Sequence, residues 1–110
     1  MNRHLRIAKQ FYRDLERVLE YLDEQAGETV VARFAAAVAS TRNHIRTFPE
    51  SGNLHYSAVI ETAELRMFPV TKFPYYLVYY IAGPDEVVLV RLLHGMRDLS
   101  TELQASDPSE

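Results

Sequence analysis

The chain has 110 residues, no cysteine and a formal net charge of −3. This length suits one domain, and the absence of cysteine excludes a disulfide framework and a thiolate zinc site. No apolar stretch approaches the roughly 20 residues that a membrane-spanning helix needs, and the N-terminus lacks the apolar core of a signal peptide. We therefore expect a cytoplasmic protein that makes no contact with a membrane.

The acidic excess lies entirely near the C-terminus. Residues 1–98 contain all 12 Lys and Arg and 12 of the 15 Asp and Glu, so they are neutral by formal count. A general nucleic-acid binder usually carries a basic excess, and we expect no direct sequence-specific binding of nucleic acid. One domain is predicted at 1–98, and residues 99–110 are predicted to be a frayed tail.

The chain is predicted to begin with a short strand and a helix. Apolar and polar residues alternate in His4–Ala8, which favours a strand. In residues 11–22 an apolar residue returns every three or four positions, as on one face of a helix. This face consists of Leu15, Val18, Leu19 and Leu22. Asp14 is predicted to lie on the opposite face, in contact with solvent.

A second helix is predicted at about 30–47, antiparallel to the first. Gly27 suits the position that follows a helix C-terminus. The apolar face of the second helix is predicted to consist of Val31, Phe34, Val38, Thr41, Ile45 and Phe48. Pro49 then stops the helix, and Gly52 lies in a turn.

The second half of the chain is rich in β-branched and aromatic residues, which favour strands. Strands are predicted at Glu64–Val70, Tyr75–Ala82 and Val87–His94, the last two joined by a turn at Gly83–Glu86. The four tyrosines of the middle strand are expected to be core on one face and a cross-strand ladder on the other. The predicted fold is therefore α+β, in the order β-α-α-β-β-β, with a helical hairpin packed on one face of a twisted antiparallel sheet.

Five stretches in this order resemble the RelE/ParE superfamily of toxins from type II toxin–antitoxin systems. They are DLERVLEYL, FPESG, LRMFPV, FPYYLVYYI and VVLVRLLHGMRD. Together they span about Leu5–Asp98, and the last is the most specific, because a strand leading into His-Gly-x-Arg-Asp is similar to the ParE branch. One position departs from the pattern, since Asn53 follows Gly52 where the family often has arginine.

The resemblance implies a toxin that a cognate antitoxin neutralises. ParE-like members are held to inhibit DNA gyrase, whereas RelE-like members cleave mRNA on the ribosome, and the shared fold cannot decide between them. The antitoxin segment is expected to be disordered when free and to fold on the toxin. It would add a strand to an open sheet edge or lay a helix beside the helical hairpin, and the two proteins are expected to form hetero-oligomers.

Cleavage of RNA without a metal needs a base, an acid and cations that stabilise the phosphorane. The candidates for this chemistry are His94, Arg66, Arg91 and Arg97. The set is small, because Tyr76 occupies the place where a RelE-like site would have an arginine, and neither Tyr nor His follows Asp98. We therefore favour gyrase inhibition by binding, with no catalytic residue. The candidates for contact with the target are Arg66, His94, Arg97 and Asp98.

Each candidate also has a structural interpretation. A histidine followed by glycine at a strand exit is commonly a hydrogen-bonded corner. Arg97 and Asp98 can pair with each other, at a gain of roughly 0–1 kcal/mol, and Arg66 can pair with Glu61 or Glu64. The four histidines have no spacing typical of metal ligands, so we expect neither a metal nor a cofactor.

Overall fold

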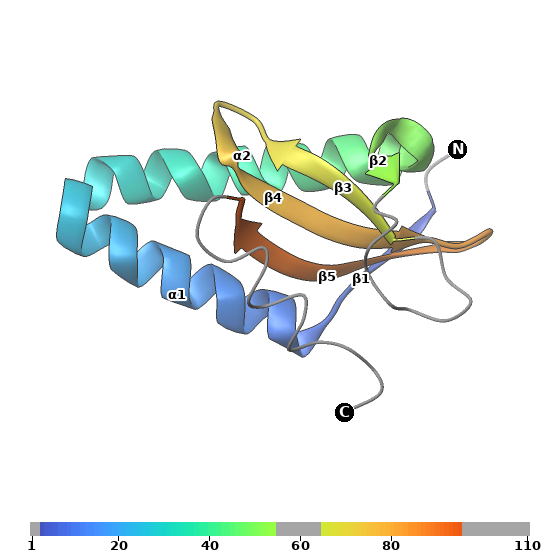
Figure 1. Ribbon diagram of the computed structural model, residues 1–110, viewed down its shortest axis with the longest axis horizontal. Coiled ribbons are helices and arrows are strands. Elements are labelled where there is room, and N and C mark those ends of the chain that lie inside the picture. Colours follow the sequence, from blue (N-terminus) through green and yellow to red (C-terminus); the bar gives the residue numbers. More distant parts are fainter. Residues whose placement is uncertain (1–2, 55–64, 96–110) are drawn as a thin grey trace.

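The computed structural model describes residues 3–54 and 65–95. The elements are β1 (His4–Ile7), α1 (Lys9–Ala26), α2 (Glu28–Thr47), a short 3-10 helix η1 (Pro49–Ser51), β2 (Asn53–Leu54), β3 (Leu65–Val70), β4 (Phe73–Ala82) and β5 (Glu86–His94). The strands form one sheet in the order β1-β5-β4-β3-β2. Figure 1 shows α1 running along β5 and α2 passing behind β3 and β4. No helix in the described ranges is long and apolar enough to cross a membrane.

The predicted order of elements is confirmed, with two differences in the sheet. β1 pairs parallel with β5, His4 lying opposite Glu86, so the sheet is mixed rather than purely antiparallel. The two-residue strand β2 was not predicted, and it extends the sheet beyond β3. A pair of residues carries no periodicity, so no pattern could indicate this strand.

A left-handed glycine joins the two helices. Gly27 has φ +88°, a conformation that residues with a Cβ adopt only at a cost. Its N–H donates to the carbonyl oxygens of Leu22 and Asp23, both at 3.2 Å. These bonds end α1 at Ala26, and α2 starts at Glu28. The glycine that the sequence placed after the first helix therefore has the predicted role.

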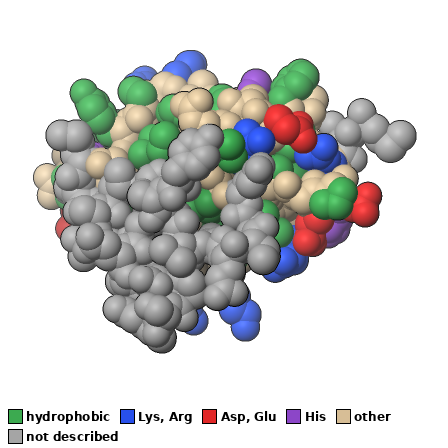
Figure 2. All heavy atoms as spheres, turned by 45° about the vertical axis from the view of Figure 1, so that its right-hand side comes forward, with side chains coloured by type: hydrophobic (Ala, Val, Ile, Leu, Met, Phe, Trp, Pro, Cys, Tyr) green, Lys and Arg blue, Asp and Glu red, His purple; other side chains and the backbone are tan. Residues whose placement is uncertain are grey.

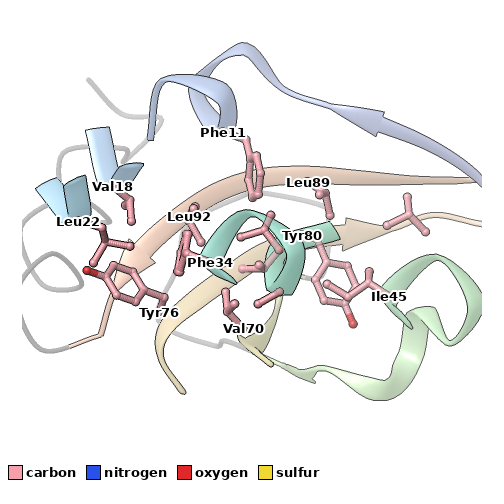
Figure 3. Close-up of a cluster of buried hydrophobic side chains, with 14 residues drawn as sticks. Phe11, Val18, Leu22, Phe34, Ile45, Val70, Tyr76, Tyr80, Leu89 and Leu92 are labelled. Carbon is pink, nitrogen blue, oxygen red and sulfur yellow. The ribbon is translucent and has the colours of Figure 1, made fainter. Parts of the chain in front are cut away.

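The main core lies between the helical hairpin and the sheet, and Figure 3 shows its side chains converging from both layers. Phe34 of α2 meets Phe73 and Tyr76 edge-on, with ring centroids 5.0 Å apart in both pairs. Phe48 was predicted on the same helical face, and this was wrong. It follows the end of α2, with φ −127° and ψ 71°, and its side chain is 57% exposed.

A second buried cluster lies on the other face of the sheet. It is formed by Leu65, Tyr79 and Leu93, with partly buried side chains around them. Alternation along β4 explains the division, because successive side chains of a strand point to opposite faces. Tyr76 and Tyr80 join the main core, whereas Tyr75 is 65% exposed and belongs to neither cluster.

Candidate functional site

A buried ion pair joins α1 to β5. The Arg91 side chain donates from Nε to Oδ2 of Asp14 at 2.8 Å and from Nη2 to Oδ1 at 3.1 Å. Asp14 is fully buried and Arg91 is 7% exposed. The prediction that Asp14 faces solvent was therefore wrong. A signal was available in the sequence, since Asp14 lies three residues after Phe11 and four before Val18, and both of these are buried.

Asp14 also completes the edge of β5 where β1 stops. β1 ends at Ile7, opposite Leu89. Further along β5, the N–H of Leu92 donates to Oδ2 of Asp14 at 3.0 Å, so the carboxylate takes the place of a neighbouring strand. The carboxylate accepts two further bonds, from Gln10 at 3.1 Å and Arg17 at 2.8 Å.

The pairing of β4 and β5 is irregular beside Arg91. Tyr79 lies opposite Arg91, but the next residue, Tyr80, lies opposite Leu89, so Val90 has no opposite residue on β4. Such bulges turn a side chain away from its regular direction. Here the bulge accompanies the turn of Arg91 toward α1 and its pairing with Asp14. Arg91 was a candidate for stabilising the phosphorane of RNA cleavage. Its guanidinium instead binds Asp14 and joins α1 to the sheet.

Arg66 fastens the segment after α2 to the sheet. Its Nη1 donates to the carbonyl oxygens of Gly52 at 2.9 Å and Glu50 at 3.2 Å. Tyr80, which lies opposite Arg66, donates from its hydroxyl to the carbonyl of Pro49 at 2.7 Å and accepts from the N–H of Gly52 at 2.9 Å. The FPESG stretch is thus held by two side chains from adjacent strands.

The acidic residues predicted or found near Arg66 have different positions. Glu61 and Glu64, the predicted ion-pair partners of Arg66, lie outside the described residues. Glu50 is instead paired with Arg3, whose Nη2 lies 2.9 Å from Oε1. The hydrogen bond from the Arg3 guanidinium holds the pKa of Glu50 below its usual value.

His94 lies at the end of β5, between two tyrosines. It is opposite Tyr76, whose ring meets it edge-on at a centroid distance of 5.0 Å. The His94 ring also stacks on Tyr75 at a centroid distance of 6.2 Å, with the two planes 17° apart. The N–H of Gly95 donates to the carbonyl oxygen of Tyr75 at 2.7 Å. This bond supports the interpretation of His-Gly as a hydrogen-bonded corner.

The candidate residues that the structure describes do not converge on one point. Arg66 lies opposite Tyr80 and His94 opposite Tyr76, so they are about 13 Å apart along β4, at about 3.3 Å per residue, and they belong to strands on either side of it. Arg91 pairs with α1, and the stretch that contains Arg97 and Asp98 lies outside the described residues. The described residues contain no group of three or more potential metal ligands.

The buried tyrosines do not supply a base. Burial raises the pKa of Tyr79 to about 12, and burial likewise raises the pKa of Tyr80. Both hydroxyls stay protonated near neutral pH, so neither can take a proton from an RNA hydroxyl. On the face drawn in Figure 2, acidic and basic side chains lie side by side among the described residues and form no extended basic region.

Two comparisons with known proteins agree on the identity of this fold. A solved structure described as the chromosomal ParDE TA system from P. aeruginosa has a chain that matches with a TM-score of 0.68. The two chains are 12% identical, and the match covers 84% of this chain and 95% of the other, which establishes similarity of fold. No curated protein matches the sequence. The family model of the ParE toxin of the type II toxin–antitoxin system parDE matches residues 5–99. The chain therefore belongs to the ParE toxin family.

Proposed function

We propose that this ParE-family toxin inhibits DNA gyrase by binding to it, without catalysis of its own, and that a cognate antitoxin neutralises it. The observation that carries the proposal is the separation of the residues that a ribonuclease would need. Arg91 is bonded to Asp14, Arg66 is bonded to backbone carbonyls, and His94 lies about 13 Å from Arg66 along β4, at about 3.3 Å per residue. Among the described residues, no base, acid and cation surround one point where a phosphate could react.

The end of β5 is the best-supported contact surface for the target. The ring of Tyr75 is 65% exposed and stacks on the half-buried His94. Exposed, rigid aromatic side chains are frequent centres of binding energy in protein interfaces. The remaining candidates, Arg97 and Asp98, follow His94 closely in the sequence. Arg66 would act indirectly, by positioning the segment that carries Gly52.

The proposed antitoxin contact includes the outer edge of β1. Within the described residues β1 pairs only with β5, on one side. The other side presents backbone groups to which a further strand can add. A segment that is disordered when free would gain these hydrogen bonds as it folds on the toxin.

The test compares two targets in parallel. Purified toxin is incubated with gyrase and relaxed plasmid, and separately with translating ribosomes and mRNA. We expect loss of supercoiling and intact mRNA, and we expect Tyr75→Ala to weaken the inhibition. Tyr12→Ala is the matched control, because Tyr12 is 53% exposed but lies on α1. Codon-positioned cuts in the mRNA together with unaffected gyrase would contradict the proposal and favour a RelE-like endoribonuclease.

A further inference from the structure

A cavity of about 470 Å³ lies between α2 and the turn that joins β3 to β4. Its volume falls within the range of known ligand pockets, about 300–1,000 Å³. Arg33 and Ser40 line it from α2, and Thr71 and Lys72 line it from the turn. Ala37 and Phe73 form an apolar part of the cavity wall. The cavity is distinct from the His94 end of β5 and from the outer edge of β1.

The cavity combines positive charge with apolar surface. Among the residues that the structure describes, Arg33 and Lys72 are the two charged residues that line the cavity, and no acidic side chain lines it. Neither cation forms an ion pair with another described residue. Residues 1–98 are neutral as a whole, so two uncompensated cations at one cavity are a local excess. Such a site attracts a carboxylate whose neighbour is apolar.

The turn that carries Lys72 is held in place against α2. The N–H of Thr71 donates to the hydroxyl oxygen of Thr41 at 3.0 Å, and that hydroxyl donates to the carbonyl oxygen of Ala37 at 2.8 Å. Thr41 is fully buried. The position of the turn relative to the helix is therefore set before any ligand arrives, which lowers the cost of ordering on binding.

Lys72 adopts a backbone conformation that is unfavourable for its residue type. Its φ is +68°, in the left-handed region that costs a residue with a Cβ roughly 1–2 kcal/mol. Glycine or asparagine would adopt it more readily. A strained residue that the surrounding structure holds in place is typical of positions that bind a ligand. The cation is therefore kept at this turn at the expense of local stability.

We propose that this cavity receives an acidic side chain, flanked by an apolar residue, from the cognate antitoxin. The proposal rests on the proposed neutralisation by an antitoxin and adds the chemistry of one contact. A peptide fits better than a nucleic acid, because a phosphate backbone is recognised by several cations along a track, whereas here two cations lie beside an apolar wall. A cavity of this volume also suits a segment that folds on binding, since a side chain of the segment can enter it.

Zero-length cross-linking tests the contact directly. The toxin is purified with the product of the adjacent open reading frame and treated with a carbodiimide, which condenses a lysine amine with a touching carboxylate to an amide. The chain has two lysines, Lys9 and Lys72, both exposed, so mass spectrometry of the peptides distinguishes them. We expect Lys72 joined to an Asp or Glu of the partner. Cross-links confined to Lys9 or the N-terminal amine, or none at all, would overturn the proposal.

Affinity measurements provide the second test. The double variant Arg33→Gln/Lys72→Asn removes both cations, and asparagine tolerates the left-handed turn. The matched control, Arg13→Gln/Lys9→Gln, removes the same charge from exposed positions on α1. We expect the pocket variant to bind the partner about tenfold more weakly and with a smaller dependence on salt, whereas the control stays within about twofold of the wild type. Unfolding midpoints no lower than that of the wild type verify that both variants are folded.

The outcomes separate this inference from the proposal on which it rests. A wild-type toxin that does not bind the partner would overturn both. A wild-type toxin that binds, with pocket and control variants equally tight, would overturn the pocket contact alone. If the pocket variant instead kept its affinity for the partner but lost binding to a fluorescent single-stranded oligonucleotide, the cavity would be a nucleic-acid site and the inference would be wrong.

Discussion

Replacing Asp14 by alanine should destabilise the fold more than almost any other single change in α1. The change would remove the carboxylate that neutralises the buried guanidinium of Arg91 and the acceptor of the Leu92 N–H. Removing one partner of a buried ion pair costs about 3–5 kcal/mol, and a buried N–H without its acceptor adds about 1–3 kcal/mol. Since a whole domain is stable by only about 5–15 kcal/mol, we expect a variant close to its unfolding midpoint at 37 °C.

The assay is urea unfolding at neutral pH, followed by circular dichroism. Glu16→Ala is the control, because Glu16 lies exposed on the same helix and should change the free energy of unfolding by less than about 0.5 kcal/mol. The double variant Asp14→Ala/Arg91→Met should recover part of the loss, since no buried charge then needs a partner. Two results would refute the structural role assigned to this pair. One is a loss of unfolding free energy below about 1 kcal/mol in Asp14→Ala. The other is a double variant whose loss equals the sum of the losses of the two single variants.

Three further predictions concern the turn regions and the core. Gly52→Ala should cost about 1–3 kcal/mol in the free energy of unfolding, because a Cβ would overlap the Tyr80 hydroxyl and lie 2.9 Å from the carbonyl oxygen of Met67; an unchanged urea midpoint would contradict this. Tyr79→Phe should flatten the decline of stability between about pH 10 and 12. The unfolded chain releases the Tyr79 proton at its ordinary pKa near 10, whereas the folded chain holds it to a pKa of about 12. The contribution of Tyr79 to the free energy of unfolding is therefore fully present below pH 10 and decreases above it. Urea denaturation at several pH values across this range measures the slope. Lys72→Gly should raise the thermal midpoint by relieving a strain of about 1 kcal/mol, and a lower midpoint would show that the left-handed backbone is not strained.

Local features of the fold were readable from the sequence because each depends on neighbouring residues. The three- and four-residue spacing located both helices, Gly27 marked their junction, and runs of β-branched and aromatic residues located β3, β4 and β5. Asp14 was misplaced because a charged residue was assumed to face solvent. Its spacing from Phe11 and Val18 pointed to the core, but its partner Arg91 is 77 residues away, and no local pattern identifies such a pair.

The candidate site was less predictable because it depends on contacts between distant segments. The sequence indicated Arg66 as a basic residue in a strand, but its acceptors are backbone carbonyls 14 and 16 residues away, and every residue has a carbonyl. The cavity beside Lys72 arises only where the β3–β4 turn meets α2. The parallel pairing of β1 with β5 also required knowledge of the whole chain, since each strand alone is compatible with either direction.

The edge of β5 has a consequence for the order in which the chain can fold. On the side of β5 that faces β1, backbone groups bond to β1 at the start of the strand and to the Asp14 carboxylate near its end. Leu92, whose N–H donates to Asp14, lies 78 residues from it in the sequence. Contacts so distant in sequence form late, because a long loop must close before they stabilise anything. The helical hairpin is local and can form early, but the face of α1 that packs on β5 stays uncovered until β5 has been synthesised. A ribosome that stops before β5 therefore releases a chain without the toxin fold, so a truncated product should be harmless and prone to aggregation rather than partly active.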